Sequence, residues 1–295
     1  MSRRAVVTCG ERHALSVAIG LRHPVGAPGG ACSVRGDTLG GVAPRVSRLR
    51  SPVSPIFLVL VALAVAGSAL TLVPATGAII GGTVLLVLAG WAVSLCLHEF
   101  SHALTADRCG DHSVRALGYL TLDIRRYANI GLTLVLPLLF LLIGGIPLPG
   151  GAVWIQRASL RSRTAISAVS LAGPLANLVL AAAIAIAVLV TGPPLPLAAA
   201  LSFLGLIQVL TFVLNLLPVP GLDGWGVIDP YLPYRTRASA ARVAPYAPFV
   251  IILALFLFRP AGELLAEVSA SLYTLVGGDR ELVVDGNIQF ARLLG

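Results

Sequence analysis

The sequence predicts an all-α polytopic membrane protein with about five to six transmembrane helices and a re-entrant hairpin between the second and third spans. Of its 295 residues, 57% are hydrophobic and only 12% are charged, whereas soluble domains have about 25% charged residues. The 21 basic residues are all arginine and gather in loops between long apolar runs. Because positively charged loops stay cytoplasmic, we interpret the net charge of +8 as membrane topology and expect no nucleic-acid partner.

Composition divides the chain into three parts. Residues 1–50 are rich in Arg, Gly, Ser and Pro without a helical or strand period, which predicts a disordered basic cytoplasmic tail. Residues 51–260 form the predicted transmembrane core, and residues 261–295 an amphipathic helix or weak span with a short polar tail. This pattern predicts a multi-pass protein of the cell (inner or plasma) membrane whose N-terminus is cytoplasmic.

Five apolar runs of the core predict membrane spans, and a sixth run leaves two possibilities open. The predicted spans are residues 56–72, 78–106, 165–190, 197–217 and 246–258, while 261–276 is either a further span or an amphipathic helix.

A further apolar run, residues 129–146, is long enough to span but has arginines on both sides. Since both flanks then lie in the cytoplasm, we interpret residues 129–156 as a re-entrant hairpin or broken helix. Such a segment is tolerated at membrane depth only where protein covers its backbone. Residues 151–156, at its end, can form a short strand.

The second predicted span ends in His98-Glu99-Phe100-Ser101-His102. Histidines four residues apart lie on one face of a helix, so both imidazoles can bind one metal ion. Glu99 can reach a water held on that metal. The alternative is a polar helix end at the membrane interface, but three such groups within an apolar segment favour a functional site.

Catalytic zinc usually has three protein ligands, so a third ligand is expected. Asp223 follows the span 197–217 and is the best candidate, although an Asp before Gly is also a common turn residue. His112, in the loop after the second span, is a weaker candidate. If residues 129–156 re-enter, Asp223 and His102 lie at the same membrane face, whereas a full crossing would separate them. The metal site and the re-entrant hairpin therefore support each other.

Asn177 ends the small-residue motif Gly173-Pro174-Leu175-Ala176-Asn177 near the expected depth of the metal. It can donate a hydrogen bond to a developing oxyanion, or it can form a packing hydrogen bond between helices. The sequence leaves both roles open.

Three motifs in this order, His98–His102, Gly173–Asn177 and Asn215–Gly224, resemble the site-2 protease family of intramembrane zinc metalloproteases over residues 55–260. The resemblance implies one Zn²⁺ per chain, bound by His98, His102 and Asp223, with Glu99 as general base and Asn177 assisting the oxyanion. It also implies single-span membrane protein substrates, cut near the cytoplasmic face, often after a first cut by a site-1-type protease. The chain has no room for the PDZ or CBS domains of many bacterial members, and its apolar hairpin at 129–147 is longer than their re-entrant element.

Two other classes of function are weighed against this one. A metal-ion transporter could use the same His/Asp site, but transporter sites lie near the bilayer midplane and often come from internal repeats. This chain shows no evident repeat, and its site is expected near one face. An inactive scaffold that binds membrane partners is the third class, and the intact ligand set argues against it.

We predict that residues 151–156 pair with the substrate as an added strand. Replacing Trp154 by proline removes a backbone donor from this strand. Trp154→Pro should therefore impair cleavage in a peptide-bond hydrolysis assay while metal analysis finds the zinc content unchanged. Cleavage at the normal rate would contradict the strand.

Overall fold

The computed structural model describes residues 53–127 and 155–293, and the regular elements of this part are all helical. A parallel bridge between Val53 and Leu122 is an isolated β-contact. The all-α prediction is confirmed for these residues. The main helices are α2 (Pro55–Thr71), α3 (Thr76–Arg108), α4 (Ser113–Ala116), α5 (Ile124–Tyr127), α7 (Arg163–Thr191), α8 (Leu195–Asn215), α9 (Asp223–Ile228), α10 (Tyr234–Val243), α11 (Ala247–Leu257), α12 (Arg259–Leu275) and α13 (Arg280–Ala291), with 3-10 turns η2 (Arg157–Ser159) and η3 (Asp229–Tyr231).

Three of these helices, α3, α7 and α8, are long and apolar enough to cross a membrane, as expected of a multi-pass membrane protein. The count rises to four if α10 and α11, which meet at a bend of 70°, form one broken span. The predicted five to six spans are not confirmed within the described part. The difference arises at α2, which is apolar but only 17 residues long, and at α12, which carries charge.

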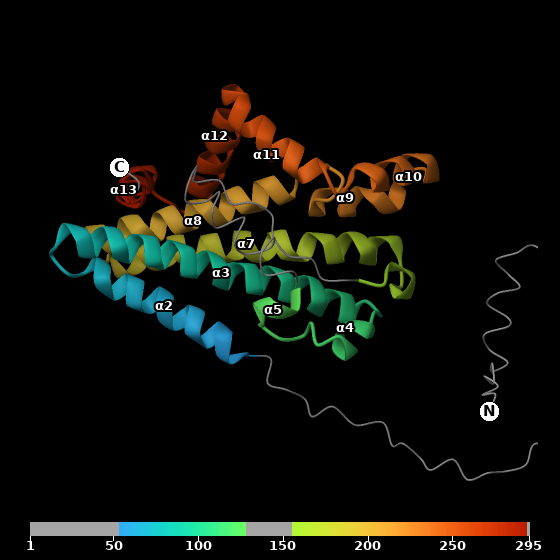
Figure 1. Cartoon of the computed structure of the whole chain (residues 1–295), viewed down its shortest axis with the longest axis horizontal. Coiled ribbons are helices and arrows are strands. Elements are labelled where there is room, and N and C mark those ends of the chain that lie inside the picture. The colour runs from blue at the N-terminus through green and yellow to red at the C-terminus, as the bar shows by residue number, and fades with distance from the viewer. Residues whose placement is uncertain (1–52, 128–154, 294–295) are drawn as a thin grey trace, which may run out of the picture. The chain divides into compact units, whose positions relative to one another are not determined.

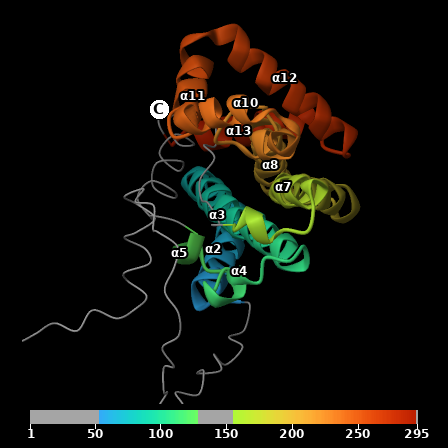
Figure 2. The ribbon, with the colours of Figure 1, turned by 90° about the vertical axis from the view of Figure 1, so that its right-hand side faces the viewer.

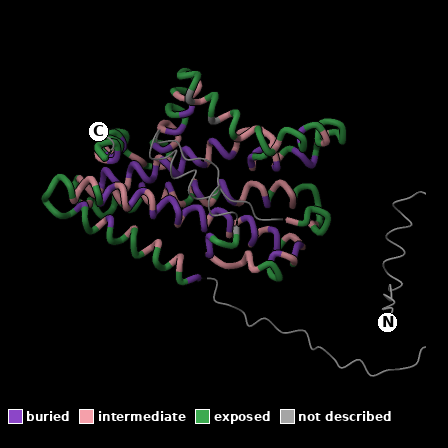
Figure 3. The backbone as a smooth tube through the Cα atoms, viewed as in Figure 1, coloured by how far each residue is buried: buried purple, intermediate pink, exposed green. Residues whose placement is uncertain are grey.

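Helix α3 is the centre of the packing and contacts α2, α7 and α8 (Figure 1). Its buried residues, among them Val87 and Trp91, share one apolar core with Phe203 and Ile207 of α8. Figure 3 shows the buried residues concentrated along α3 and α8. By contrast, the C-terminal part of α7 exposes large apolar side chains, such as Leu189 at 75%. Apolar exposure on this scale is expected where a helix faces lipid.

Helices α11 and α12 lie on the side of α8 that is remote from α2 (Figure 2). Leu265 and Tyr273 of α12 are buried against α8, whereas Glu263 and Glu267 are exposed. Helix α12 is therefore amphipathic, and it is not among the described helices apolar enough to span.

The tail expected to be short and polar forms a helix. In α13, Val283 and Phe290 are buried in the main core, and a Cβ on Gly286 would touch Phe203 of α8. Thr83 of α3 donates a hydrogen bond to Gln289 at 2.9 Å. Sequence reasoning missed α13 because its apolar residues are interspersed with charged and polar ones.

The expected tail (residues 1–50), the run 129–146 and residues 151–154 of the expected strand lie outside the described residues. The described flanks of this internal segment meet the same end of the helical layer. Ser54, at the start of α2, donates to the carbonyl of Leu122 at 2.6 Å. On the other flank, Arg161 N–H donates to the carbonyl of Cys109, just after α3, at 3.1 Å. This common position is what the re-entrant hairpin requires, and the hairpin itself stays a prediction.

Helices α2 and α3 touch backbone to backbone at two glycines. A Cβ added to Gly82 would lie 2.7 Å from Thr71 N and 2.8 Å from Gly67 O, while a Cβ on Gly81 would meet nothing within 4 Å. Small residues allow such close approach of membrane helices.

We predict that Gly82→Ala lowers the thermal stability of the detergent-solubilised protein, because it forces the two backbones apart. Overpacking of this kind costs about 1–3 kcal/mol. The matched variant Gly81→Ala should be neutral or slightly stabilising, because Ala favours a helix by up to about 1 kcal/mol over Gly. Equal melting temperatures for the two variants would argue against the close contact.

Candidate metal centre

One stripe of α3 forms a wall of a cavity of about 1010 Å³. Its residues recur at the i, i+3, i+4, i+7 spacing of a single helix face. From the deep end to the metal-binding candidates they are Trp91, Ser94, Leu95, His98, Glu99 and His102. Residues of α7, α8, α9 and α10, of the segment around η2 and of the turn before α9 form the other described walls. A cavity of this size is at the upper end of those that bind small ligands, and it can hold a short peptide segment.

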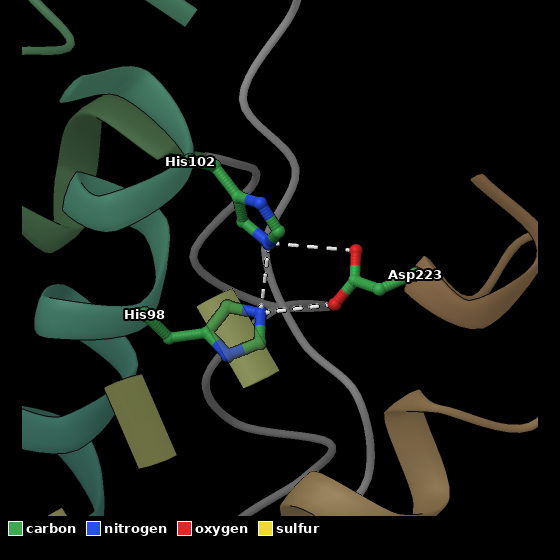
Figure 4. Close-up of side chains that lie close together, drawn as sticks. All are labelled: His98, His102 and Asp223. Atoms are coloured by element: carbon green, nitrogen blue, oxygen red, sulfur yellow. Dashed lines mark hydrogen bonds and ion pairs between the residues drawn. The ribbon is translucent and has the colours of Figure 1, made fainter. Parts of the chain in front are cut away.

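Three side chains from α3 and α9 converge in this cavity (Figure 4). The Nε2 atoms of His98 and His102 lie 3.1 Å apart. The carboxylate of Asp223 faces both, with Oδ2 at 3.2 Å from His98 Nε2 and Oδ1 at 3.4 Å from His102 Nε2. Among the described residues, this is the cluster of His, Cys, Asp or Glu side chains that could hold a metal ion, and its ligand atoms lie within 4.8 Å of one another. The three candidate ligands identified from the sequence thus lie close together in the structure.

Both histidines are buried and held through their other ring nitrogen. The Nδ1 of His98 lies 2.6 Å from Asn177 Oδ1, and the Nδ1 of His102 lies 2.7 Å from the carbonyl oxygen of Val169, both on α7. Because an oxygen of this kind only accepts, each Nδ1 carries a proton, and a ring in its neutral form then has its lone pair on Nε2. Metal-binding histidines are held in this way, with the ligating nitrogen facing the metal.

Asp223 is the first residue of α9, and its neighbours explain its position. Gly221 has a φ of +96°, which favours glycine, and a Cβ on Gly224 would collide with the carbonyl of Leu216 at the end of α8. Burial opposes ionisation of Asp223, but the interactions with His102 and His98 outweigh it and hold the pKa of Asp223 below its ordinary value. Asp223 is therefore a carboxylate at neutral pH, the form that binds a metal.

An ion cluster fixes the segment that carries Asp223. Asp229, on η3 directly after α9, is buried between Arg157 at 2.5 Å and Arg237 at 3.4 Å. Ser167 of α7 also donates to the carbonyl of Val227 in α9 at 2.7 Å. Both arginines line the cavity, so this cluster is part of its wall as well as an anchor for α9.

The residues present fit a zinc ion. Two imidazoles and one carboxylate are a donor set found at catalytic zinc sites, which keep a fourth position for water or substrate. Helix α7 presents bare backbone to this space at Gly173. A Cβ there would lie 2.6 Å from His98 Nε2 and closer still to His102 Nε2, where it would occupy the space between the ligands.

The other predicted site residues have different positions. Glu99 is buried at 3% exposure and lines the same cavity beside His98. Asn177 contacts His98 and also donates to Gln208 Oε1 at 2.8 Å, so it forms the interhelical hydrogen bond that the sequence left open. Its role at an oxyanion stays a prediction. His112 lies away from the cluster, exposed and paired with Asp107 at 3.1 Å.

Sequence reasoning missed Gln208, which is fully buried on α8. A signal was present, because Gln208 is a strongly polar residue within a largely apolar span, and such residues are frequently functional.

Comparison with known proteins agrees with the site. The chain is 42% identical over 243 residues to Rip2 of Mycobacterium tuberculosis, a protein named as a zinc metalloprotease, and the match covers 80% of this chain and 92% of Rip2. The chain belongs to the site-2 protease family of zinc metalloproteases. Rip2 of Mycolicibacterium smegmatis is 44% identical over 215 residues (68% of this chain and 80% of that protein). YwhC of Bacillus subtilis, also named as a zinc metalloprotease, is 32% identical over 181 residues (58% and 79%).

No protein-family model matches the chain, and no solved structure matches it. The family and the enzyme class inferred from three short motifs are confirmed by these relatives. For a site-2 protease, the His-His-Asp cluster implies zinc as the metal.

We predict that Gly173→Ala prevents zinc binding, because the added methyl group occupies the space between His98 and His102. Metal analysis of the purified protein should find zinc in the wild type and little in the variant. Gly81→Ala, a glycine-to-alanine change in open space on α3, is the control and should retain its zinc. A Gly173→Ala protein with a full complement of zinc would show that the ion lies elsewhere.

Proposed function

We propose that this chain is an intramembrane zinc metalloprotease that hydrolyses peptide bonds within transmembrane segments of other membrane proteins, near the cytoplasmic face. The convergence of His98, His102 and Asp223 in the wall of a large cavity carries this proposal. These three residues bind one zinc ion per chain. The donors come from the C-terminal part of one candidate span and from the helix that follows another, so the site lies near one end of the spans.

Zinc at this site supplies Lewis-acid chemistry, lowering the pKa of a water and polarising the scissile carbonyl. Glu99 takes the proton of the attacking water as general base and then passes it to the leaving amine. Glu99 is buried beside His98 in the cavity wall, so it faces the same space as the three candidate ligands. Asn177 holds His98, and its amide can also assist the oxyanion.

The distribution of arginines supports a cytoplasmic site. Arg157 and Arg237 line one end of the cavity, and further arginines lie on α10 and before α7. Because positively charged segments remain in the cytoplasm, this end of the cavity opens there and admits water, and the N-terminus lies on the same side. The opposite end reaches Trp91, two helical turns beyond His98. Substrates are single-span membrane proteins, which a site-1-type protease can cut first.

We predict that Glu99→Gln lowers the cleavage rate by about 10²–10⁴-fold while zinc content stays at the wild-type level, because it removes the proton acceptor but no ligand. The assay uses the purified protein in detergent or liposomes with single-span membrane proteins encoded nearby as candidate substrates. His98→Ala is the companion variant and should lose both zinc and activity.

The same variants separate the protease from a metal-ion transporter. A transporter with Glu99→Gln need not lose zinc flux across liposomes, whereas the wild-type protease should show no flux at all. Zinc flux without cleavage by the wild-type protein would favour the transporter over the protease. A wild-type protein without bound metal would contradict both proposals.

A further inference from the structure

A chain of hydrogen bonds crosses three helices behind His98. From α3, His98 Nδ1 lies 2.6 Å from Asn177 Oδ1 on α7, and Asn177 Nδ2 donates to Gln208 Oε1 on α8 at 2.8 Å. All three side chains are buried, with Gln208 at 0% exposure. This series of hydrogen bonds begins at His98, a candidate ligand, and ends at Gln208 in the protein interior, away from solvent.

The direction of these hydrogen bonds decides whether His98 can bind a metal. As observed, the Asn177 oxygen accepts from Nδ1–H, which leaves the lone pair on Nε2, next to His102 and Asp223. With the carboxamide reversed, its N–H would donate to Nδ1, and the ring proton would move to Nε2. A protonated Nε2 has no lone pair for the metal.

His102 and His98 differ in how this choice is made. The partner of His102 is the carbonyl of Val169, which can only accept, so its tautomer is fixed by the backbone. The partner of His98 is an amide with an acceptor at one end and donors at the other, so it requires a further group to orient it. Gln208 Oε1 is that group, because it accepts from the Asn177 nitrogen and turns the Asn177 oxygen towards His98.

A packing role does not explain a glutamine at this position. Its Nε2 is buried without a hydrogen-bond partner among the described residues, and an unsatisfied buried donor is destabilising. An apolar side chain of similar volume would avoid this cost. The feature that an apolar side chain lacks is the oxygen that Asn177 contacts.

We propose that Gln208 is a positioning residue for the metal centre: through the Asn177 amide it keeps the proton of His98 on Nδ1 and so raises the affinity of the site for zinc. The inference rests on the proposed function in one respect, that His98 is a zinc ligand.

The test compares Gln208→Leu with Gln208→Glu by zinc affinity, measured in competition with a chelator on the purified protein. Loss of a hydrogen-bond partner behind a metal ligand typically costs 10–100-fold in metal affinity, so Gln208→Leu should weaken zinc binding by about tenfold or more. Gln208→Glu keeps an oxygen acceptor and should stay within about twofold of the wild type. A packing role predicts the reverse order, since Leu suits a buried site and a carboxyl group does not. That order would overturn the proposal.

A double-mutant cycle tests whether Gln208 acts through Asn177. Asn177→Ala alone should weaken zinc binding by about 10–100-fold. Adding Gln208→Leu to Asn177→Ala should then cause no further loss, because the oriented amide is already absent. Independent, additive losses would show that Gln208 acts elsewhere.

A measurement on the metal-free protein reads the tautomer directly. The ¹⁵N resonances of the histidine ring nitrogens should show His98 protonated at Nδ1 in the wild type and in Gln208→Glu, and a shift towards Nε2 in Gln208→Leu. Gln208→Met, which has similar length but no acceptor, should behave as Gln208→Leu does and replaces it if that variant does not fold. His102 is the internal control, and it should stay protonated at Nδ1 in every variant because the carbonyl of Val169 can only accept. An unaltered His98 in both variants would contradict the proposal.

Failure here is distinguishable from failure of the proposed function. If His98→Ala still binds zinc at full affinity, the ligand set is wrong whatever Gln208 does. If His98→Ala loses zinc but Gln208→Leu and Gln208→Met do not weaken it, the metal centre stands and the positioning role falls.

Discussion

The meeting of two imidazole nitrogens from α3 with one carboxylate from α9 is the constraint on which the rest of the structure depends. The three ligand atoms can come within 4.8 Å of one another only if the C-terminal part of α3 and the end of α8 lie at the same face of the membrane. Helix α7 must then begin at that face and run back along α3, which places Val169, Gly173 and Asn177 against the histidines. The order of the spans, the small residues of α7 and the turn before α9 all follow from this one requirement.

The ligands of the site are held in place by the surrounding protein. The histidines lie on a helix that is packed on several sides, and their outer nitrogens are held by α7, so their orientation is set before any metal arrives. Asp223 comes instead from a short helix held by the buried Asp229 and its two arginines at the cavity wall. Sites that are organised in advance lose less freedom when they bind a ligand or a transition state.

Much of this arrangement could be predicted from the sequence, and the limits have physical causes. His98 and His102 could be predicted as a pair of ligands because the i, i+4 spacing fixes their geometry locally. Asp223 required a topological argument, which used the arginines on either side of residues 129–146. Gln208 was missed because its partner is 31 residues away on another helix, and no local period reports such a contact. The predicted number of spans is not confirmed by the described residues. Hydropathy alone does not separate a lipid-facing helix from an apolar helix that bends, as α10 and α11 do, or from one that packs along α8, as α12 does.

Because His102 and Asp223 are far apart along the chain, a metal ion bound by both would also stabilise the fold. An ion held by both residues is a cross-link that closes a loop containing α7 and α8, and long closed loops restrict the unfolded chain in the way that a disulfide does. The ends of α3 and α8 that carry the ligands would then be joined by coordination bonds as well as by packing. Zinc would thus stabilise the fold at the end of the helices that holds the site, and chelation would loosen the fold at the same place where it stops the chemistry.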